Sequence, residues 1–162
     1  MKLEPIGIIH SPHQEAVGTP VQSSMAGGVE GTIEIYPQFA QGLKDIEGFE
    51  RIWLVYWFHR AKPSKLLVVP YLDTVPHGVF ATRAPCRPNP IGLSSVRLLK
   101  VQGNILHVEG LDVLDGSPLL DIKPYIPSFD GFETTRIGWC KNVKVTSAVA
   151  DGRFTNNEMT TL

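Results

Sequence analysis

Hydrophobic and polar residues alternate, or nearly so, over residues 3–10 and 32–36, with the two-residue period of β-strands. Residues 52–58, Ile-Trp-Leu-Val-Tyr-Trp-Phe, are β-branched and aromatic without a polar gap, which is typical of a strand covered on both faces. Two later apolar runs are separated only by Gln102-Gly103-Asn104, a sequence that favours a hairpin turn. In all, strands are predicted over residues 3–10, 32–36, 52–58, 66–71, 94–101 and 105–108.

One segment, residues 37–46, has a helical pattern. Pro37 stands at its start, and Phe39, Leu43 and Ile46 are spaced to share one face. The other segments are closely spaced strands linked by turns. They predict an all-β fold, a small and mainly antiparallel β-barrel with one or two short helices, because closing a sheet removes its exposed edges.

The length of 162 residues suits one domain and is too short for two of ordinary size. We therefore expect a single domain over residues 1–162, with a core over about 3–147. Residues 137–140 and 143–145 predict a last strand that closes the barrel. Residues 148–162 are expected to form a mobile tail, because the end of the chain is polar.

The net charge of −1 hides an asymmetry. Between residues 59 and 100 there are seven basic side chains and a single acid, Asp73, which gives a local net charge of +6. One basic face can contact nucleic-acid phosphates even when the whole protein is slightly acidic. Scattered, solvated surface charges would give the same count, so both readings stay open.

Several classes of protein do not fit the chain. No apolar stretch reaches the ~18 to 20 residues of a membrane-spanning helix, and the N-terminus lacks the blocks of a signal peptide, so a cytoplasmic protein is expected. Dispersed histidines and only two cysteines, Cys86 and Cys140, indicate reduced thiols and no metal site. The strands do not alternate with helices, and no glycine-rich strand-to-helix turn is present, which excludes a dinucleotide-type site.

A first motif covers residues 78–96 and contains three prolines, together with Arg83 and Arg87, between two strand-like runs. Each proline fixes its own φ and biases the preceding residue toward extended geometry. A loop stiffened in this way holds its side chains ready for a ligand. A proline-rich turn that closes the barrel, with solvated arginines, is the alternative interpretation.

A second motif covers residues 112–125 and places three aspartates and a lysine around the turn sequence Asp-Gly-Ser-Pro. For Asp115, a hairpin corner whose carboxylate caps backbone amides is as good an interpretation as a functional role. Asp121 and Lys123 are two residues apart on a predicted strand, so they face the same side.

Together the two motifs make the chain resemble the TrmO family. The resemblance rests on Gly-Val-Phe-Ala-Thr-Arg-Ala-Pro-Cys-Arg-Pro-Asn-Pro-Ile-Gly-Leu-Ser and Asp-Gly-Ser-Pro-Leu-Leu-Asp-Ile-Lys-Pro-Tyr, and it runs from residue 6 to about residue 127. It implies a β-barrel, a homodimer, S-adenosylmethionine as cofactor, and methyl transfer to N6 of adenosine 37, bearing threonylcarbamoyl, in the anticodon loop of tRNA. Fewer than forty residues follow Tyr125, so the short, single-domain form is expected.

The resemblance also implies which residues contact the cofactor. A sulfonium beside an amino acid needs a carboxylate partner, a cationic partner and an apolar wall for its adenine. Val21 departs from the family, in which arginine is common at this position. Without the resemblance, His59 would be interpreted as a buried structural histidine. The implied contacts are Pro20, Val21, Gln22, His59, Arg60, Arg83, Leu93, Asp112, Val113, Leu114 and Asp115.

The acceptor side is predicted from other polar residues of the two motifs and the basic stretch. Candidate catalytic residues are Asn89, Asp121, Lys123 and Tyr125, with Asn89 or the Tyr125 hydroxyl positioning N6. Candidate RNA contacts are Arg87, Lys62 and Lys65. Two alternatives remain open: a module that binds S-adenosylmethionine without transferring a methyl group, and an RNA-binding barrel without enzymatic activity.

Overall fold

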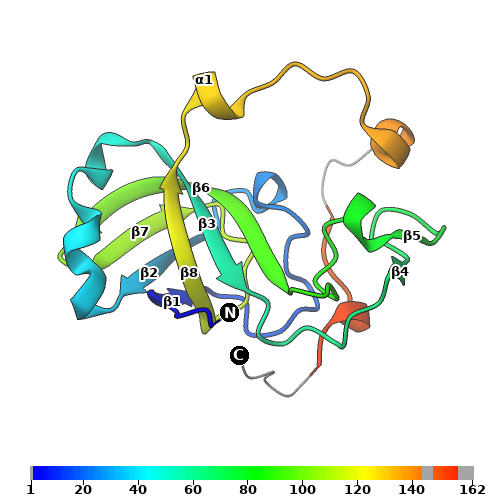
Figure 1. The fold of residues 1–162 in the computed structure, drawn as a ribbon, viewed down its shortest axis with the longest axis horizontal. Coiled ribbons are helices and arrows are strands. Elements are labelled where there is room, and N and C mark those ends of the chain that lie inside the picture. Colours follow the sequence, from blue (N-terminus) through cyan, green and yellow to red (C-terminus); the bar gives the residue numbers. More distant parts are fainter. Residues whose placement is uncertain (1, 144–147, 157–162) are drawn as a thin grey trace.

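The chain folds into a closed antiparallel β-barrel with a smaller lobe beside it (Figure 1). The computed structural model describes residues 2–143 and 148–156. Around the barrel the strand order is β1-β2-β7-β6-β3-β8, so β1 and β8 pair and close the sheet. The barrel strands are β1 (Gly7–His10), β2 (Glu30–Ile35), β3 (Arg51–Trp57), β6 (Ile91–Gln102), β7 (Ile105–Glu109) and β8 (Ser117–Pro124). The predicted all-β barrel is therefore confirmed.

Helices in the described residues are short. Within residues 2–143 and 148–156 the one α-helix is α1 (Pro127–Asp130). The 3₁₀ helices are η1 (Ser23–Met25), η2 (Pro37–Leu43), η3 (Ile46–Gly48), η4 (Val79–Ala81), η5 (Gly138–Asn142) and η6 (Gly152–Phe154). The segment predicted as one helix over 37–46 is thus two 3₁₀ helices, separated at Asp45, whose φ of 68° is left-handed and interrupts a helix. Phe39, Leu43 and Ile46 still pack against the core, as their spacing predicted.

The barrel core is built from every second residue of the strands. β3 shows the pattern most clearly, because Ile52, Leu54 and Tyr56 are buried while Trp53 and Val55 are half-buried on the outer face. The prediction that residues 52–58 are covered on both faces is therefore right for the inner face only. The core residues are Ile9, Ile33, Ile35, Ile52, Leu54, Tyr56, Val96, Leu106, Val108, Leu111, Val113 and Leu119.

Gly92 allows β3 and β6 to pack closely. It lies opposite Tyr56 in the ladder, and a Cβ at this position would overlap the Tyr56 ring. Only a residue without a side chain lets the ring lie flat against the β6 backbone. The glycine of the first motif therefore positions a buried tyrosine at one end of the barrel.

The side lobe consists of residues 61–90, 138–143 and 148–156. Its strands β4 (Leu67–Val68) and β5 (His77–Gly78) form a two-residue ladder, much shorter than the strand predicted over 66–71. Its own small core consists of Val68, Val79, Ala84, Cys86 and Phe154, with Tyr71 packed against it. The thiol of Cys86 is buried and free.

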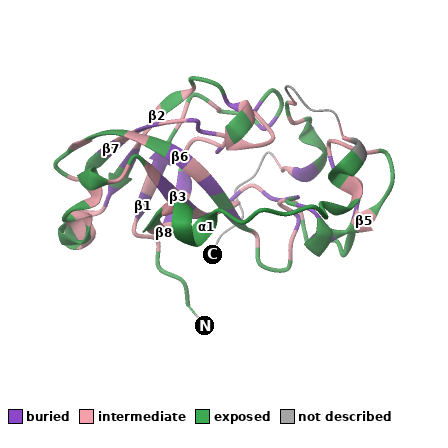
Figure 2. Ribbon diagram, turned by 90° about the horizontal axis from the view of Figure 1, so that it is seen from above, coloured by how far each residue is buried: buried purple, intermediate pink, exposed green. Residues whose placement is uncertain are grey.

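An exposed arm, residues 126–137, connects the barrel to the side lobe (Figure 1). Figure 2 shows α1 and the chain after it exposed, whereas the buried positions concentrate in the barrel strands. At the far end of the arm, Trp139 stacks on His77 with ring centroids 4.8 Å apart. The indole Nε1 of Trp139 also donates to the backbone oxygen of Ala81 at 2.7 Å.

Two predictions for the C-terminal region need correction. Residues 138–142 form the 3₁₀ helix η5 instead of a closing strand, because β1 and β8 already close the barrel; Lys144 and Val145 lie outside the described residues. Residues 148–156 are packed, with Phe154 buried, and do not form a free tail. Residues 157–162 lie outside the described residues.

Candidate functional site

Topology places most of the implied cofactor residues at one end of the barrel, called here the site end. At this end β3 and β7 finish, β6 and β8 begin, and the long loop after β1 starts. Arg83 lies in the loop that leads into β6, His59 follows β3, and Asp112 follows β7. Residues separated by up to ninety positions in the sequence therefore share one edge of the fold.

A chain of buried hydroxyls leads to Asp112 at the site end. The Ser94 hydroxyl donates to Asp112 Oδ1 at 2.6 Å, and the Tyr56 hydroxyl lies 3.1 Å from Ser94 Oγ. Ser94 and Tyr56 point into the barrel from neighbouring strands. Burial raises the pKa of Tyr56 well above its usual range, and the nearby Asp112 charge raises it further.

Asp112 is a carboxyl group held in a low-dielectric environment. Burial raises its pKa to about 6, although hydrogen bonds from Ser94 and from the backbone at Ser23, together with the Arg83 charge, act in the opposite direction. At neutral pH the group is largely ionised and incompletely compensated by its neighbours. A cationic ligand would supply the missing compensation.

Arg83 and Gln22 form the second polar feature of the site end. Arg83 Nη1 donates to Gln22 Oε1, and Arg83 is exposed. Gln22 comes immediately before Ser23, whose backbone contacts Asp112. The structure therefore brings Gln22, Arg83 and Asp112 together, as the resemblance implied.

Pro20 and Val21 are held by the C-terminal residues. Pro20 forms a β-bridge with Val149, and the Val21 amide donates to the Ala148 oxygen at 3.0 Å. Their backbone is thus paired to a distant segment.

His59 and Arg60 have structural contacts. His59 is only 6% exposed, its Nδ1 lies 3.1 Å from the Ser117 hydroxyl, and burial followed by the Arg60 charge lowers its pKa. Arg60 donates to the Gln14 oxygen at 2.6 Å and pairs with Glu15 at 3.0 Å. These contacts match the structural interpretation of the histidine and leave its cofactor role a prediction.

Residues 113–115 are tied to the chain that follows β1. Val113 is buried, and its oxygen accepts from the Ser11 hydroxyl at 2.6 Å. Asp115 Oδ1 accepts from the Ser11 amide at 3.0 Å, so its carboxylate caps the backbone as the alternative interpretation predicted. Leu114 is half-buried between them.

Leu93 lies on the opposite face of the sheet from Ser94. It is 56% exposed and lies across from Val55, whose other neighbour in the sheet is Asp121. Nearby on this outer face, Trp57 has an indole N–H that is buried and has no partner within the described part of the chain. An unpaired buried donor is costly, so a bound molecule that accepts from it would gain affinity.

The candidate catalytic residues do not gather at one place. Lys123 pairs with Asp121 at 2.7 Å on the outer face, which confirms that the two side chains share a side. The Tyr125 ring packs against the Trp53 ring at a tilt of 54°, with centroids 5.6 Å apart, and Tyr125 lies beside the start of β3, at the end of the barrel opposite the site end. Of the four, Asn89 alone lies at the site end, exposed just before β6.

Two of the three candidate RNA contacts have partners inside the protein. Arg87 Nη1 donates to the oxygens of Val79, Thr82 and Ala84 at 3.2, 2.9 and 3.2 Å. Lys62 Nζ donates to two backbone oxygens of η6 at 3.1 Å each. Lys65 is exposed. Arg87 thus stabilises its own proline-rich loop, residues 79–90, through bonds to the loop backbone. The role of Arg87, Lys62 and Lys65 in RNA binding stays a prediction.

Tyr56, Ser94 and Trp57 also lie in or near the candidate site but were not predicted as site residues from the sequence. A signal for Ser94 was present, because it occupies an inward position of a strand where alternation calls for an apolar residue. Tyr56 and Trp57 gave no such signal, because they lie in residues 52–58, where every side chain is apolar or aromatic and is expected in the core. Among the described residues no group of His, Cys, Asp and Glu side chains could hold a metal ion, and no helix there is long and apolar enough to cross a membrane.

Fold and candidate site together define a small β-barrel protein with a cluster of polar side chains at one end. Residues 8–131 match the family described as tRNA-methyltransferase O N-terminal domain, and the chain belongs to this family, as its motifs predicted. A "Probable S-adenosyl-L-methionine-binding protein" of Pyrococcus abyssi is 60% identical over 152 residues, covering 93% of this chain and 83% of the relative.

Two further similarities extend to proteins longer than this chain. A crystal structure of TrmO from Pseudomonas aeruginosa has a TM-score of 0.72 and 38% identity, covering 86% of this chain and 62% of that one. A mouse "tRNA (adenine(37)-N6)-methyltransferase" is 36% identical over 134 residues, covering 78% of this chain and 31% of the relative. The chain thus spans less than two thirds of both proteins.

Proposed function

We propose that this chain is an S-adenosylmethionine-dependent methyltransferase acting on N6 of adenosine 37 in tRNA. The proposal is carried by the presence of the desolvated Asp112 carboxylate and the exposed Arg83 guanidinium at the same end of the barrel, because they offer a ligand one anionic and one cationic partner. S-adenosylmethionine has a sulfonium, an ammonium and a carboxylate. The names of the Pyrococcus and mouse relatives support this choice of ligand and reaction.

The residues fit such a ligand in defined roles. Asp112 would bind the positive charge, with Ser94 orienting its carboxylate. Arg83, kept in place by Gln22, would bind the ligand carboxylate. When bound, the cofactor supplies an activated methyl group, and Asn89 at the same end would accept a hydrogen bond from the adenine amine and align it.

The acceptor is proposed to carry a threonylcarbamoyl group. The carboxylate of this group needs a cationic partner, and the exposed Lys65 is a candidate. Lys65 lies beside the loop that holds Arg83, because its amide donates to the Cys86 oxygen of that loop at 3.2 Å. An unstacked base in an anticodon loop is accessible to a small protein. The expected homodimer is part of the same proposal, with exposed Ile91 and Leu93 on the outer face as candidate interface.

The test is methyl transfer by the purified full chain. Incubation with tritiated S-adenosylmethionine and bulk tRNA, followed by nucleoside mass analysis, should give a methylated threonylcarbamoyladenosine. Asp112→Asn and Arg83→Met should each abolish incorporation, whereas Asp45→Asn, an exposed residue with left-handed backbone that asparagine tolerates, should not. Full incorporation by both site variants would contradict the proposal.

A cofactor-binding module without transferase activity is the second candidate. It is favoured by the name of the Pyrococcus relative, which states binding of S-adenosylmethionine and no reaction. Cofactor binding without incorporation into any tRNA would select this candidate. Binding of tRNA without cofactor would select the third, an RNA-binding barrel.

A further inference from the structure

Residues 148–156, called here the C-terminal clasp, lie beyond the family match but contact two segments of the candidate site. On one side the clasp pairs with the loop after β1. Gly18 N donates to the Ala150 oxygen at 2.9 Å, and Ala150 N donates to the Thr19 oxygen at 2.7 Å. Pro20 and Val21 continue this pairing, so the clasp backs the chain that leads directly to Gln22.

On its other side the clasp is bonded to the chain that follows β3. The Lys62 amide donates to the Phe154 oxygen at 2.9 Å, and Asn156 N donates to the Arg60 oxygen at 2.8 Å. The Cys86 thiol, in the proline loop, donates to the Phe154 oxygen at 3.4 Å. The clasp therefore lies between the loop that holds Gln22 and the loop that holds Arg83.

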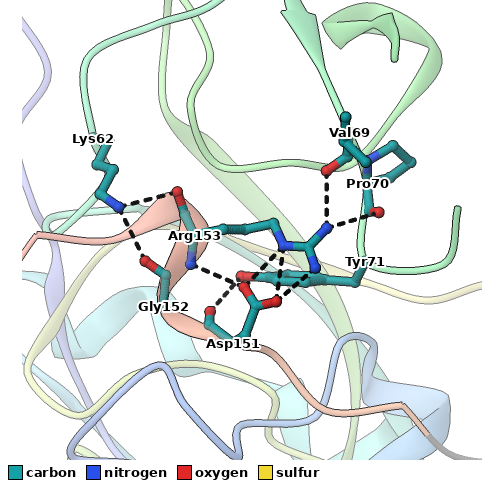
Figure 3. A network of polar contacts seen from close by, with 7 residues as sticks. All are labelled: Lys62, Val69, Pro70, Tyr71, Asp151, Gly152 and Arg153. Atoms are coloured by element: carbon teal, nitrogen blue, oxygen red, sulfur yellow. Dashed lines mark hydrogen bonds and ion pairs between the residues drawn. The ribbon is translucent and has the colours of Figure 1, made fainter. Parts of the chain in front are cut away.

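Arg153 secures the clasp to the side lobe (Figure 3). Its guanidinium pairs with Asp151 at 2.6 Å, donates to the Val69 and Pro70 oxygens at 3.4 and 3.3 Å, and lies 5.2 Å from the centre of the Tyr71 ring. The planar guanidinium carries several N–H donors in fixed directions, so this single rigid group bonds several acceptors at once.

Tyr71 and Lys62 complete the attachment. The Tyr71 hydroxyl donates to the Asp151 oxygen at 3.1 Å, and the Tyr71 ring packs edge-on against buried Phe154 at 5.0 Å. Lys62 Nζ donates to the oxygens of Gly152 and Arg153 (Figure 3).

We propose that the C-terminal clasp holds the Pro20–Gln22 element against Arg83, and that Arg153 is a positioning residue for the cofactor half of the site. The proposal rests on the proposed function, since it assigns the clasp to the cofactor end. Arg153 has no direct contact with Gln22, Arg83 or Asp112 in the described residues, so it acts through the backbone pairing of residues 148–150 with 18–21.

The test compares Arg153→Met with two other variants of the full chain. Arg153→Met keeps the length of the side chain but removes the fork, and Tyr71→Phe removes a single hydrogen bond and serves as the milder change. Arg136→Met, an exposed arginine of the arm, is the control. Hydrogen exchange of the amides of residues 18–22 and calorimetric titration with S-adenosylmethionine are the two readouts.

In Arg153→Met we expect faster exchange at residues 18–22, unchanged exchange in β3 and β6, and affinity weakened by about three- to tenfold. Tyr71→Phe should show the same changes to a smaller extent, and the control none. Unchanged exchange at 18–22, or faster exchange with unchanged affinity, overturns the proposal. If the unaltered chain binds no S-adenosylmethionine, the proposed function is wrong and the role of the clasp in cofactor binding is wrong with it. If the unaltered chain and Arg153→Met bind S-adenosylmethionine with equal affinity, only the role of the clasp is wrong.

Discussion

Burial of Asp112 in the fold disfavours the ionised carboxylate that the proposed cofactor binding requires. Its carboxyl is desolvated, and the Ser94 hydrogen bond and the Arg83 charge only partly offset the cost of burial. Because the pKa in the folded state, about 6, is above the value in the unfolded chain, the folded state binds this proton more tightly. Ionisation of Asp112 therefore lowers stability as the pH rises from about 4 through 6.

Replacing Asp112 by asparagine should stabilise the protein while removing its affinity for a cation. At pH 7.5 we expect the free energy of unfolding of Asp112→Asn to rise by on the order of 1 to 3 kcal/mol, since the amide keeps an acceptor for Ser94 without a buried charge. Denaturant unfolding measures the change, with Asp45→Asn as the control. A variant less stable than the parent at pH 7.5 would show that the carboxylate is well compensated in the fold.

The pH dependence of binding should follow the same group. Affinity for S-adenosylmethionine should be constant above pH 7 and fall as the pH drops through about 6, because protonation removes the anionic partner. Titrations at pH 5.5 and 7.5 measure the effect, and Asp112→Asn should show no such dependence. Equal affinities of the parent chain at both pH values would exclude Asp112 as the ionised partner.

At the scale of elements, β3 and β6 determine the shape of the site end. Their ladder pairs Gly92 with Tyr56, and the ring position allows the hydroxyl to reach Ser94. A change in the backbone contact therefore propagates to the Asp112 carboxylate through two hydrogen bonds.

Gly92→Ala should destabilise the protein and weaken cofactor binding together. The added methyl overlaps the Tyr56 ring, which must move within a closed core, at a cost of about 1 to 3 kcal/mol. Thermal unfolding and titration measure the two effects. Gly78→Ala is the matched control from the same motif, because its φ of −57° suits alanine and nothing lies within 4 Å of the added carbon. Equal melting temperatures for the two variants would contradict this account of the packing.

Some of the secondary-structure elements could be predicted from the sequence and others could not. Runs such as residues 52–58 and 105–108 gave correct strands because their β-branched and aromatic side chains favour strands. The expected strand at 137–140 was wrong because its apolar residues dock an arm onto the side lobe, a tertiary contact without a periodic signal. Phe154 likewise packs with apolar residues from the distant segment 68–86.

At the scale of the whole molecule, the two predicted halves of the site are separated. The proposed cofactor residues Gln22, Arg83 and Asp112 come together at the site end, whereas Asp121 and Lys123 lie on the outer face and Tyr125 lies toward the opposite end. The family resemblance implied contacts from all three residues of the first group, and their role toward a cofactor stays a prediction. The motifs did not show the separation, because the position of a side chain along a strand depends on register and on the bulge between Val55 and Tyr56.

This separation predicts unequal effects of the acceptor-side variants. Asn89→Ala should lower kcat for tRNA methylation by about tenfold or more with unchanged cofactor affinity, because Asn89 lies at the site end and can align the amine. Asp121→Ala should affect kcat less and act mainly through KM for tRNA. Steady-state kinetics with separate titration of the cofactor distinguish the two, and the reverse order would assign the acceptor to the outer face of β8.

The stacked rings of Trp139 and His77 provide the protein with an intrinsic optical probe. Indole emission is sensitive to an imidazole ring stacked on it with ring centroids 4.8 Å apart, and the Asp73 carboxylate holds this imidazole in place through a contact of 2.8 Å with His77 Nε2. With Trp53 and Trp57 replaced by phenylalanine, the emission of the single remaining tryptophan would report whether residues 126–137 stay attached at both ends when a transfer RNA binds.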